Sequence, residues 1–374
     1  MTSSIPLGRI LGIRIGINWS WLVVFALISW TLGSGIFPRT NPGLSHASYV
    51  WMAIVASILF FVSLLLHELG HAVQARRDGM EIDGITLWLF GGVARFRGMF
   101  PSAGAEFRIA IAGPLVSLAL GLLFALGAWA ISSRGSIDAV AAWLGYINLT
   151  LLVFNLLPAL PLDGGRVLRS ILWHARGDFR WATRIAASIG RAFAYLFIAG
   201  GLILFIFQGS FSGAWLAFIG WFLYQAATAE VRYLLVHDAL GGLRVADVMV
   251  RDPVTVDPRL TVGRFMDEVA PSGRYTTYPV VEGGRAVGLL AFRCLAAVPR
   301  AEWDSHSVGE CMIPRERIPV LRAAQSAVDA LSALGDGDVR RGLVLDGDRL
   351  VGFVSITDLL RALGDERDRP ARAV

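Results

Sequence analysis

Lysine is absent from this chain, and cysteine is nearly so. All 34 basic residues are therefore arginine, which we interpret as genomic base composition rather than as a sign of function. The two cysteines, Cys294 and Cys311, exclude a disulfide framework and indicate a reducing compartment. The N-terminus also lacks the short apolar region and small-residue cleavage site of a secretory signal, so we expect the first apolar segment to remain as an anchor.

Hydrophobic residues, by contrast, are abundant. They make up 55% of the chain, the mean hydropathy is +0.58 and there are 12 Trp, which is typical of an integral membrane protein with a soluble part attached. Apolar runs dominate up to about Leu235, and no segment beyond it could span a bilayer. We predict a polytopic α-helical membrane domain of about six transmembrane helices with a small β-hairpin, the helices lying near residues 17–37, 48–75, 105–132, 139–158, 183–207 and 213–235.

The arginines indicate how this domain is oriented. They gather before the first span (Arg9, Arg14), between the second and third (Arg76, Arg77, Arg95, Arg97, Arg108) and between the fourth and fifth (Arg166, Arg169, Arg176, Arg180, Arg184). The loops on the opposite side hold only Arg39 and Arg134. By the positive-inside rule, both termini and the soluble part are cytoplasmic in a multi-pass protein of the cell membrane. Because topology explains the arginines and the pI of about 9.7, we expect the lipid bilayer and no nucleic acid as a partner.

The second apolar segment carries a metal-binding pattern. His67-Glu68-Leu69-Gly70-His71 ends an uncharged run from Val50 to Leu66. Histidines four residues apart share one face of a helix, so both imidazoles can bind one metal ion while Glu68 acts on a nearby water. We predict a zinc site with His67 and His71 as ligands and Glu68 as general base, since ionisable groups in apolar helices are costly and by default functional. The alternative is a pair of helix-end histidines packed among their neighbours.

A catalytic zinc ion usually has three protein ligands, so one must come from elsewhere in the chain. The segment 155–165 ends the fourth apolar run, where Pro158 and Pro161 break the helix before Asp163. Irregular backbone at membrane depth survives only when it is buried in protein or lines a wet cavity, as an active site does. We predict Asp163 as the third ligand; the alternative is that it caps the following helix.

An intramembrane HExxH followed by a distant Asn-x-x-Pro-x-x-Pro-Leu-Asp-Gly resembles the site-2 protease family of intramembrane zinc proteases, over about residues 1–235. The resemblance implies that Asn155 donates to the developing oxyanion. It also implies a hairpin at Phe90-Gly91-Gly92-Val93-Ala94 that pairs with an unwound substrate. The alternatives are that Asn155 satisfies backbone freed near Pro158, and that Gly91 and Gly92 form a re-entrant turn on the inner leaflet. For Gly70 and Gly113 we expect a simple packing role.

The soluble region, about 243–364, contains an internal repeat. The runs 245–249 and 308–312 correspond, as do the glycine hairpins before Gly288 and Gly352, at offsets of 63 and 64 residues. Each copy is predicted to fold as an α+β unit that pairs with its twin. We divide the chain into a membrane domain at 1–238, repeats at 243–300 and 301–364, and a disordered tail at 365–374.

The two repeats resemble a tandem pair of cystathionine-β-synthase (CBS) domains, which a subgroup of site-2 proteases carries. In that family a Gly-x-x-Ser/Thr-x-x-Asp run ends each copy and contacts a nucleotide. The second repeat keeps this run with Ser355 and Asp358, whereas the first has Ala291 and Cys294 instead. The resemblance therefore implies at most one adenine-nucleotide site. The alternative leaves Asp358 as a helix cap and the repeat pair as a homodimerisation surface.

Together these features predict a membrane-embedded zinc metalloendopeptidase that cleaves peptide bonds within or near transmembrane segments of membrane proteins. The expected setting is regulated signalling, in which another protease first removes the external part of the substrate. The main alternative is a CBS-gated transporter or channel whose intramembrane His and Asp bind ions. An ion path has no need of Glu68 beside His67, whereas hydrolysis does. An inactive scaffold is disfavoured because the ligands and the base are all present.

Overall fold

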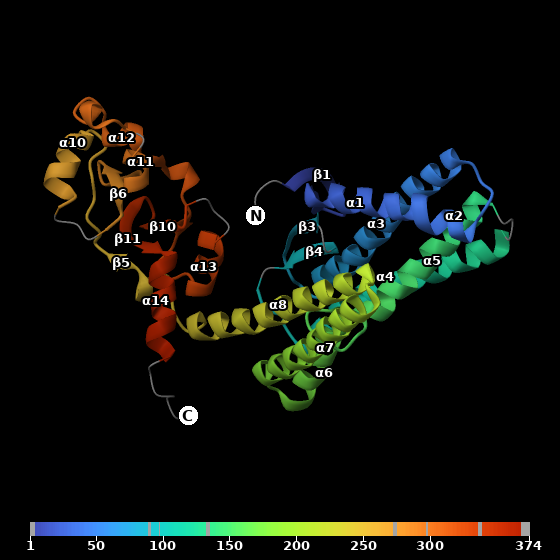
Figure 1. The fold of residues 1–374 in the computed structure, drawn as a ribbon. Coiled ribbons are helices and arrows are strands. Elements are labelled where there is room, and N and C mark those ends of the chain that lie inside the picture. Colours follow the sequence, from blue (N-terminus) through green and yellow to red (C-terminus); the bar gives the residue numbers. More distant parts are fainter. Residues whose placement is uncertain are drawn as a thin grey trace. The chain divides into compact units, whose positions relative to one another are not determined.

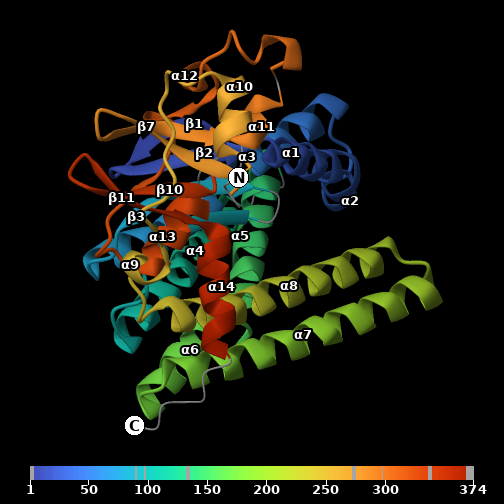
Figure 2. The same ribbon diagram turned by 90° about the vertical axis from the view of Figure 1, so that its left-hand side faces the viewer.

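The fold is described from a computed structural model, which covers residues 4–88, 91–96, 98–131, 135–271, 275–296, 298–335 and 339–367. The chain divides into two compact units, residues 1–232 and 233–374. The first unit holds the long apolar helices and a small sheet, and the second holds a larger sheet with short helices (Figures 1 and 2).

The helices of the first unit follow the predicted apolar segments closely. The first segment forms α1, Ser20–Thr31, and continues through a π-helical turn at Leu32–Ile36 into α2, Phe37–Thr40. In Figure 1 the helices labelled α3, α4 and α5 lie side by side. Figure 2 shows the helices labelled α7 and α8 as a long hairpin. The bounds are α3 His46–Arg77, α4 Ala103–Ile131, α5 Ser136–Asn155, α6 Asp163–Arg176, α7 Phe179–Gln208 and α8 Phe211–Leu240.

Within the described residues, five helical segments are long and apolar enough to cross a membrane: Ser20–Thr40, α3, α4, α5 and α7. The sixth predicted span, 213–235, lies in α8, which is long enough but is not among these five. Gln225, Glu230 and Arg232 make the second half of α8 more polar. By length and composition, the described residues therefore contain five of the about six predicted spans.

Helix α3 carries the HExxH motif close to its charged end. Its N-terminus is capped by Ser45, whose Oγ accepts a hydrogen bond from the Ser48 N–H at 3.1 Å. At the other end Arg76 donates to the Leu11 carbonyl oxygen. His67 lies roughly 13 Å along the helix from Arg76, at 1.5 Å per residue. The motif is thus well inside the apolar helix, yet within three turns of its arginines.

A four-stranded sheet packs on this end of α3. Its order is β1 (Ser4–Ile10), β2 (Ile13–Asn18), β3 (Ile82–Trp88), β4 (Gly91–Phe96), with β2 and β3 parallel and the other pairs antiparallel. The sequence predicted only the hairpin of β3 and β4. Ile13, Ile15 and Ile85 form an apolar cluster with Leu69 and Ala72 of α3. This cluster fixes the sheet against the helix turn that contains the motif.

The proline-rich segment between α5 and α6 is packed tightly by glycines. A β-carbon on Gly190 of α7 would overlap the Leu160 carbonyl oxygen, and one on Gly165 would overlap the Leu160 backbone nitrogen. Leu160 is itself fully buried. The start of α6, and with it Asp163, is therefore held between α5 and α7, because no side chain separates these backbones.

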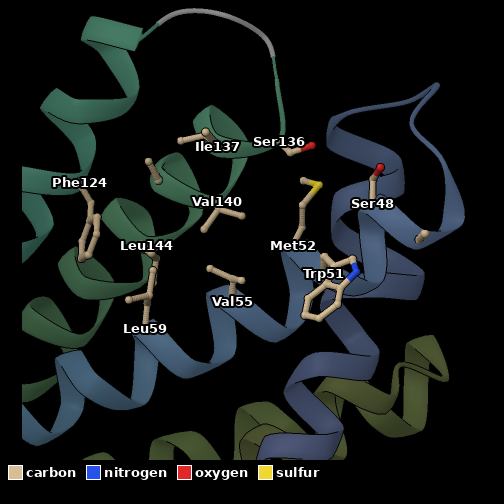
Figure 3. A pocket seen from close by; sticks show the side chains of 12 residues that line it. Ser48, Trp51, Met52, Val55, Leu59, Phe124, Ser136, Ile137, Val140 and Leu144 are labelled. Carbon is tan, nitrogen blue, oxygen red and sulfur yellow. The ribbon is translucent and has the colours of Figure 1, made fainter.

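An apolar cavity of about 530 Å³ lies at the end of the bundle remote from the motif. Figure 3 shows Met52, Val55 and Leu59 of α3 facing Val140 and Leu144 of α5 across it. Its walls contain no titratable side chain and none of the residues predicted to act in catalysis. The cavity is therefore not the predicted catalytic site.

The second unit contains a seven-stranded sheet in which the two repeats interleave. Its strands are β5 Val250–Arg251, β6 Thr277–Glu282, β7 Arg285–Ala291, β8 Ile313–Pro314, β9 Val320–Leu321, β10 Arg341–Asp346 and β11 Arg349–Ser355. Strand β5 of the first repeat pairs with β11 of the second, and β8 of the second pairs with β7 of the first. The repeats thus exchange equivalent strands, so neither completes its sheet alone.

Short helices flank this sheet: α9 Val245–Val248, α10 Val262–Arg264, α11 Phe292–Leu295, α12 Val308–Cys311, α13 Ala327–Gly335 and α14 Ile356–Arg367. Leu240, the last residue of α8, is fully buried in the core of this unit with Val344, Val354 and Leu359. Helix α14 runs to Arg367, so residues 365–367 of the predicted disordered tail are helical. The rest of that tail, 368–374, lies outside the described residues.

Candidate metal centre

His67 and His71 lie one turn apart on the same face of α3. Both side chains are buried, with 2% and 5% of their surface exposed. Their Nε2 atoms approach to 3.2 Å. The two imidazoles thus converge on one point, as the i, i+4 spacing of the motif predicts.

Asp163 completes this group from α6. Its Oδ2 atom lies 3.2 Å from Nε2 of His67 and 3.2 Å from Nε2 of His71. The three atoms form a nearly equilateral triangle, and a tetrahedral zinc ion with bonds of about 2.0–2.1 Å has ligand atoms about 3.3 Å apart. Asp163 is the first residue of α6 and not its cap, since Leu162 occupies the cap position. The residues and their spacing therefore fit a zinc ion.

Helix α4 orients both histidines from the opposite side. The Ile109 carbonyl oxygen lies 2.7 Å from Nδ1 of His71, and Ser117 Oγ lies 2.9 Å from Nδ1 of His67. A carbonyl oxygen can only accept, so Nδ1 of His71 carries its proton and leaves Nε2 with a free lone pair. Such contacts fix ring orientation and ligand basicity at metal sites.

Gly113 lies between those two α4 residues and against the metal-binding atoms. A β-carbon on it would overlap Nε2 of His71 and would lie 2.7 Å from Nε2 of His67. The expectation of a simple packing role for Gly113 is therefore wrong, because its missing side chain leaves the space in which the ligand atoms converge. Gly70 does have a packing role, since a β-carbon there would lie 3.0 Å from the Ala112 carbonyl oxygen.

Glu68 extends from α3 toward the sheet. A β-carbon on Gly92 of β4 would lie 2.7 Å from Cδ and 3.0 Å from Oε1 of Glu68. The carboxylate thus rests on the backbone of β4 beside the two histidines. Gly91, the neighbouring residue, has φ +124°, a conformation that favours glycine. Phe90, part of the hairpin motif, lies outside the described residues.

Asn155 is the last residue of α5. A β-carbon on Gly164 would overlap the carbonyl oxygen of Leu156, so the end of α5 touches the start of α6 one residue away from Asp163. Within the described part of the chain, no hydrogen bond engages the Asn155 side chain. The residue after Asn155 thus contacts the start of α6, and no described residue engages the Asn155 amide.

Arg166, one turn beyond Asp163, was not singled out from the sequence. Its guanidinium is close enough to Glu68 and to Glu106 of α4 to act electrostatically on both carboxylates. Its Nε atom is buried without a hydrogen-bond partner among the described residues. The spacing of three residues from Asp163 could have indicated this position, since it places both side chains on one face of α6.

Ser355 and Asp358, predicted to contact a nucleotide, bind each other at the start of α14. Asp358 Oδ2 accepts hydrogen bonds from the Ser355 backbone N–H at 2.9 Å and from the Ser355 hydroxyl at 2.6 Å. The Asp358 N–H in turn donates to Ser355 Oγ at 3.3 Å. This is the reciprocal arrangement of a capping box, so the capping role considered for Asp358 is present.

These features define a class. Inside apolar helices, two imidazoles and a carboxylate converge on one point, and a second carboxylate lies beside them. This arrangement is typical of a metal-dependent hydrolase that works within a membrane.

Comparison with known proteins specifies the family. The profile of Peptidase family M50 matches residues 55–134 and 129–198, and that of the CBS domain matches 245–298 and 308–365. Rip3 of Mycobacterium tuberculosis is 39% identical over 370 residues, covering 97% of this chain and 93% of its own. Zinc metalloprotease MJ0392 of Methanocaldococcus jannaschii is 32% identical over 363 residues, or 97% of each chain. The chain belongs to the site-2 proteases of Peptidase family M50, and is a zinc metalloprotease of the membrane with two CBS domains.

A solved structure is also similar. The site-2 protease from Methanocaldococcus jannaschii matches with 32% identity and a TM-score of 0.42, over 61% of this chain and 95% of that one.

Proposed function

We propose that this protease performs regulated intramembrane proteolysis: it hydrolyses peptide bonds within or near the transmembrane segments of membrane proteins already cut by another protease. The observation that carries the proposal is the triangle of 3.2 Å between Nε2 of His67, Nε2 of His71 and Oδ2 of Asp163, inside apolar helices. A buried group of this kind has a function by default, because its members are costly at membrane depth.

In this proposal His67, His71 and Asp163 hold one zinc ion. When bound, zinc lowers the pKa of water at its open position and polarises a peptide carbonyl. The Ile109 carbonyl and the Ser117 hydroxyl keep the imidazoles turned so that their Nε2 atoms face inward. Gly113 keeps that inner face free of side-chain atoms.

Glu68 is the proposed general base and acid. Its carboxylate takes a proton from the attacking water and delivers it to the nitrogen of the leaving amine. The contact with Gly92 restricts where the carboxylate can lie, because the β4 backbone blocks movement in that direction. The side chain is therefore kept beside the histidines, where proton transfer is needed.

Asn155 is the proposed donor to the oxyanion that develops on the peptide carbonyl. Its support is the close contact between the end of α5 and the start of α6, together with an amide that no described residue engages. A donor of this type contributes about 3 kcal/mol to transition-state stabilisation.

The β3–β4 hairpin is the proposed binding site for an unwound substrate. A transmembrane helix has its backbone carbonyls hydrogen-bonded, so it must open before hydrolysis. Strand β4 is at the end of the four-stranded sheet, so one of its edges has no strand partner in the described part of the chain. A substrate strand added to this edge would run past Gly92 and hence past Glu68.

We further propose that both termini and the CBS module are cytoplasmic, and that the module responds to an adenine nucleotide. The arginine distribution supports the orientation. For the nucleotide, Asp358 uses Oδ2 to hold Ser355, and a carboxylate has lone pairs beyond these two bonds with which to accept from a ribose hydroxyl. The pair of CBS domains is also the proposed surface for a homodimer.

The test is Glu68→Gln in the full-length protein, co-expressed with a helical membrane substrate. We expect zinc content to stay at the wild-type level and cleavage to be abolished, because glutamine cannot take up the proton. Cleavage at the wild-type rate would contradict the role of Glu68. Wild-type protein that contains no zinc would contradict the metal centre itself.

A further inference from the structure

Arg169 of α6 is buried in the membrane unit, with 3% of its surface exposed. Its Nε and Nη2 atoms lie 2.7 Å and 2.5 Å from Oε1 of Glu106 on α4. Glu106 is itself fully buried. This ion pair directly joins α4 to α6.

A third helix shares the same guanidinium. Nη1 of Arg169 lies 3.3 Å from Oε2 of Glu230 on α8. The Glu230 side chain is 25% exposed. The rings of Phe179 and Phe100 lie against the guanidinium, with centroids 5.0 Å and 5.9 Å from Cζ. Arg169 is thus enclosed by α4, α8 and two aromatic rings, and its position is fixed on several sides.

Burial of such a cluster of charged groups is unfavourable in free energy. Transfer of charges out of water is energetically unfavourable, and a buried ion pair often adds nothing to stability compared with apolar residues. The pairing is also incomplete, because Oε2 of Glu106 is buried without a hydrogen-bond partner among the described residues. Stability alone therefore does not explain why these charges lie here.

The two helices joined by this pair are the ones that build the metal centre around α3. Helix α4 carries Glu106 three residues before Ile109, whose carbonyl holds His71. Helix α6 begins with Asp163, six residues or about 9 Å before Arg169. The ion pair thus fixes the carboxylate ligand relative to the helix that orients the imidazoles.

We propose that Arg169 is a positioning residue of the metal centre. By pairing with Glu106 and Glu230 it holds α6 in place against α4 and α8, and this sets where Oδ2 of Asp163 meets the two histidines. The inference rests on the proposed function, since it assumes that the three residues bind zinc.

The test is the zinc dissociation constant of the full-length protein in lipid nanodiscs, measured by competition with a chromogenic chelator and without substrate. Arg169→Met should weaken zinc binding about tenfold, as loss of a group that supports a metal ligand does. Arg176→Gln is the matched control: Arg176 ends the same helix, is exposed and stacks on Trp181 at 4.5 Å, so its zinc affinity should equal that of the wild type.

A second variant separates positioning from the cost of a stranded charge. Glu106→Gln with Arg169→Met removes the link but leaves no unpaired buried carboxylate on α4. If Arg169 positions Asp163, the double variant still binds zinc weakly. Wild-type zinc affinity in the double variant would overturn the proposal, and so would wild-type affinity in Arg169→Met. If Arg169→Met does not fold, the zinc affinity of the double variant decides alone: weak binding supports the proposal, and wild-type affinity overturns it.

The steady-state parameters give a further check. A displaced ligand impairs the chemical step, so kcat of Arg169→Met should fall while KM for the helical substrate stays unchanged. A rise in KM with unchanged kcat would contradict positioning and would assign Arg169 to substrate binding. Wild-type protein that binds no zinc would contradict the proposed function, whereas normal binding in both wild type and Arg169→Met would contradict this inference alone.

Discussion

Gly92 lies directly against Glu68. A β-carbon at residue 92 would be 2.7 Å from Cδ of the glutamate and 3.0 Å from its Oε1, and would overlap Cγ. The hairpin glycine thus contacts the carboxylate that is the proposed general base, in addition to its place in the proposed substrate-binding strand. This contact links the predicted general base to the predicted substrate-binding strand, which are 24 residues apart in the sequence.

Gly92→Ala should therefore lower kcat about 100-fold while zinc content stays unchanged. The added methyl group displaces the Glu68 carboxylate by about 1 Å, and a displacement of that size costs about two orders of magnitude in rate. The measurement is cleavage rate against zinc stoichiometry. Gly127→Ala is the control, since no heavy atom lies within 4 Å of a β-carbon there. Unimpaired cleavage by Gly92→Ala would show that Glu68 does not need its present position.

Gly113→Ala should weaken zinc binding, whereas Gly92→Ala should displace the Glu68 carboxylate. Its methyl group would occupy the place where Nε2 of His71 and Nε2 of His67 meet, 2.7 Å from the latter. We expect zinc affinity to fall about 100-fold and cleavage to fall with it, in contrast to Gly92→Ala. Zinc titration of the two variants side by side checks this difference. Equal zinc affinity in both variants would contradict the role assigned to Gly113.

Ser117→Ala removes the hydroxyl that lies 2.9 Å from Nδ1 of His67. Loss of such a partner typically costs 10- to 100-fold in metal affinity, and we expect a value of about tenfold because the backbone contact of His71 remains. Ser63→Ala is a suitable control: Ser63 lies one turn before His67 on α3 and bonds the Leu59 carbonyl oxygen. A zinc dissociation constant equal to that of Ser63→Ala would refute the prediction.

Ser355→Ala tests the CBS module. The hydroxyl both caps α14 and bonds Asp358, so its loss should lower the free energy of unfolding of this unit by about 1 kcal/mol. Asp358→Ala should in addition abolish the rise in melting temperature that AMP or ATP produces in the full-length protein. Cys294→Ala, at the equivalent position of the first repeat, should leave that rise intact. If no adenine nucleotide alters the melting temperature of the wild type, the nucleotide proposal fails.

The sequence was sufficient to predict that His67, His71 and Asp163 lie together. His67 and His71 follow from a helical spacing that is local, and Asp163 follows from two prolines that stop a helix at membrane depth. The contacts from α4 could not be predicted in this way. Ile109 and Ser117 are 38 and 50 residues from the histidines that they hold, and no local periodicity specifies which turn of α4 faces α3.

The fold was predictable to a similar extent. Long apolar helices and the repeat were recognisable, because each is specified by composition or by self-similarity. The hairpin of β1 and β2 was missed because residues 5–10 of β1 are all exposed, so no buried face imposes the apolar and polar alternation that marks a strand in a sequence. The predicted span 213–235 is less apolar than the other five, because Gln225, Glu230 and Arg232 lie in the second half of α8.

The central claim is that one zinc ion is held by His67, His71 and Asp163, and X-ray absorption of the zinc-loaded full-length protein tests it most directly. We predict only nitrogen and oxygen neighbours, at about 2.0–2.2 Å, with loss of the zinc signal in Asp163→Ala. Sulfur neighbours at about 2.3 Å would assign the metal to Cys294 or Cys311 and contradict the account. An unchanged spectrum in Asp163→Ala would contradict it equally.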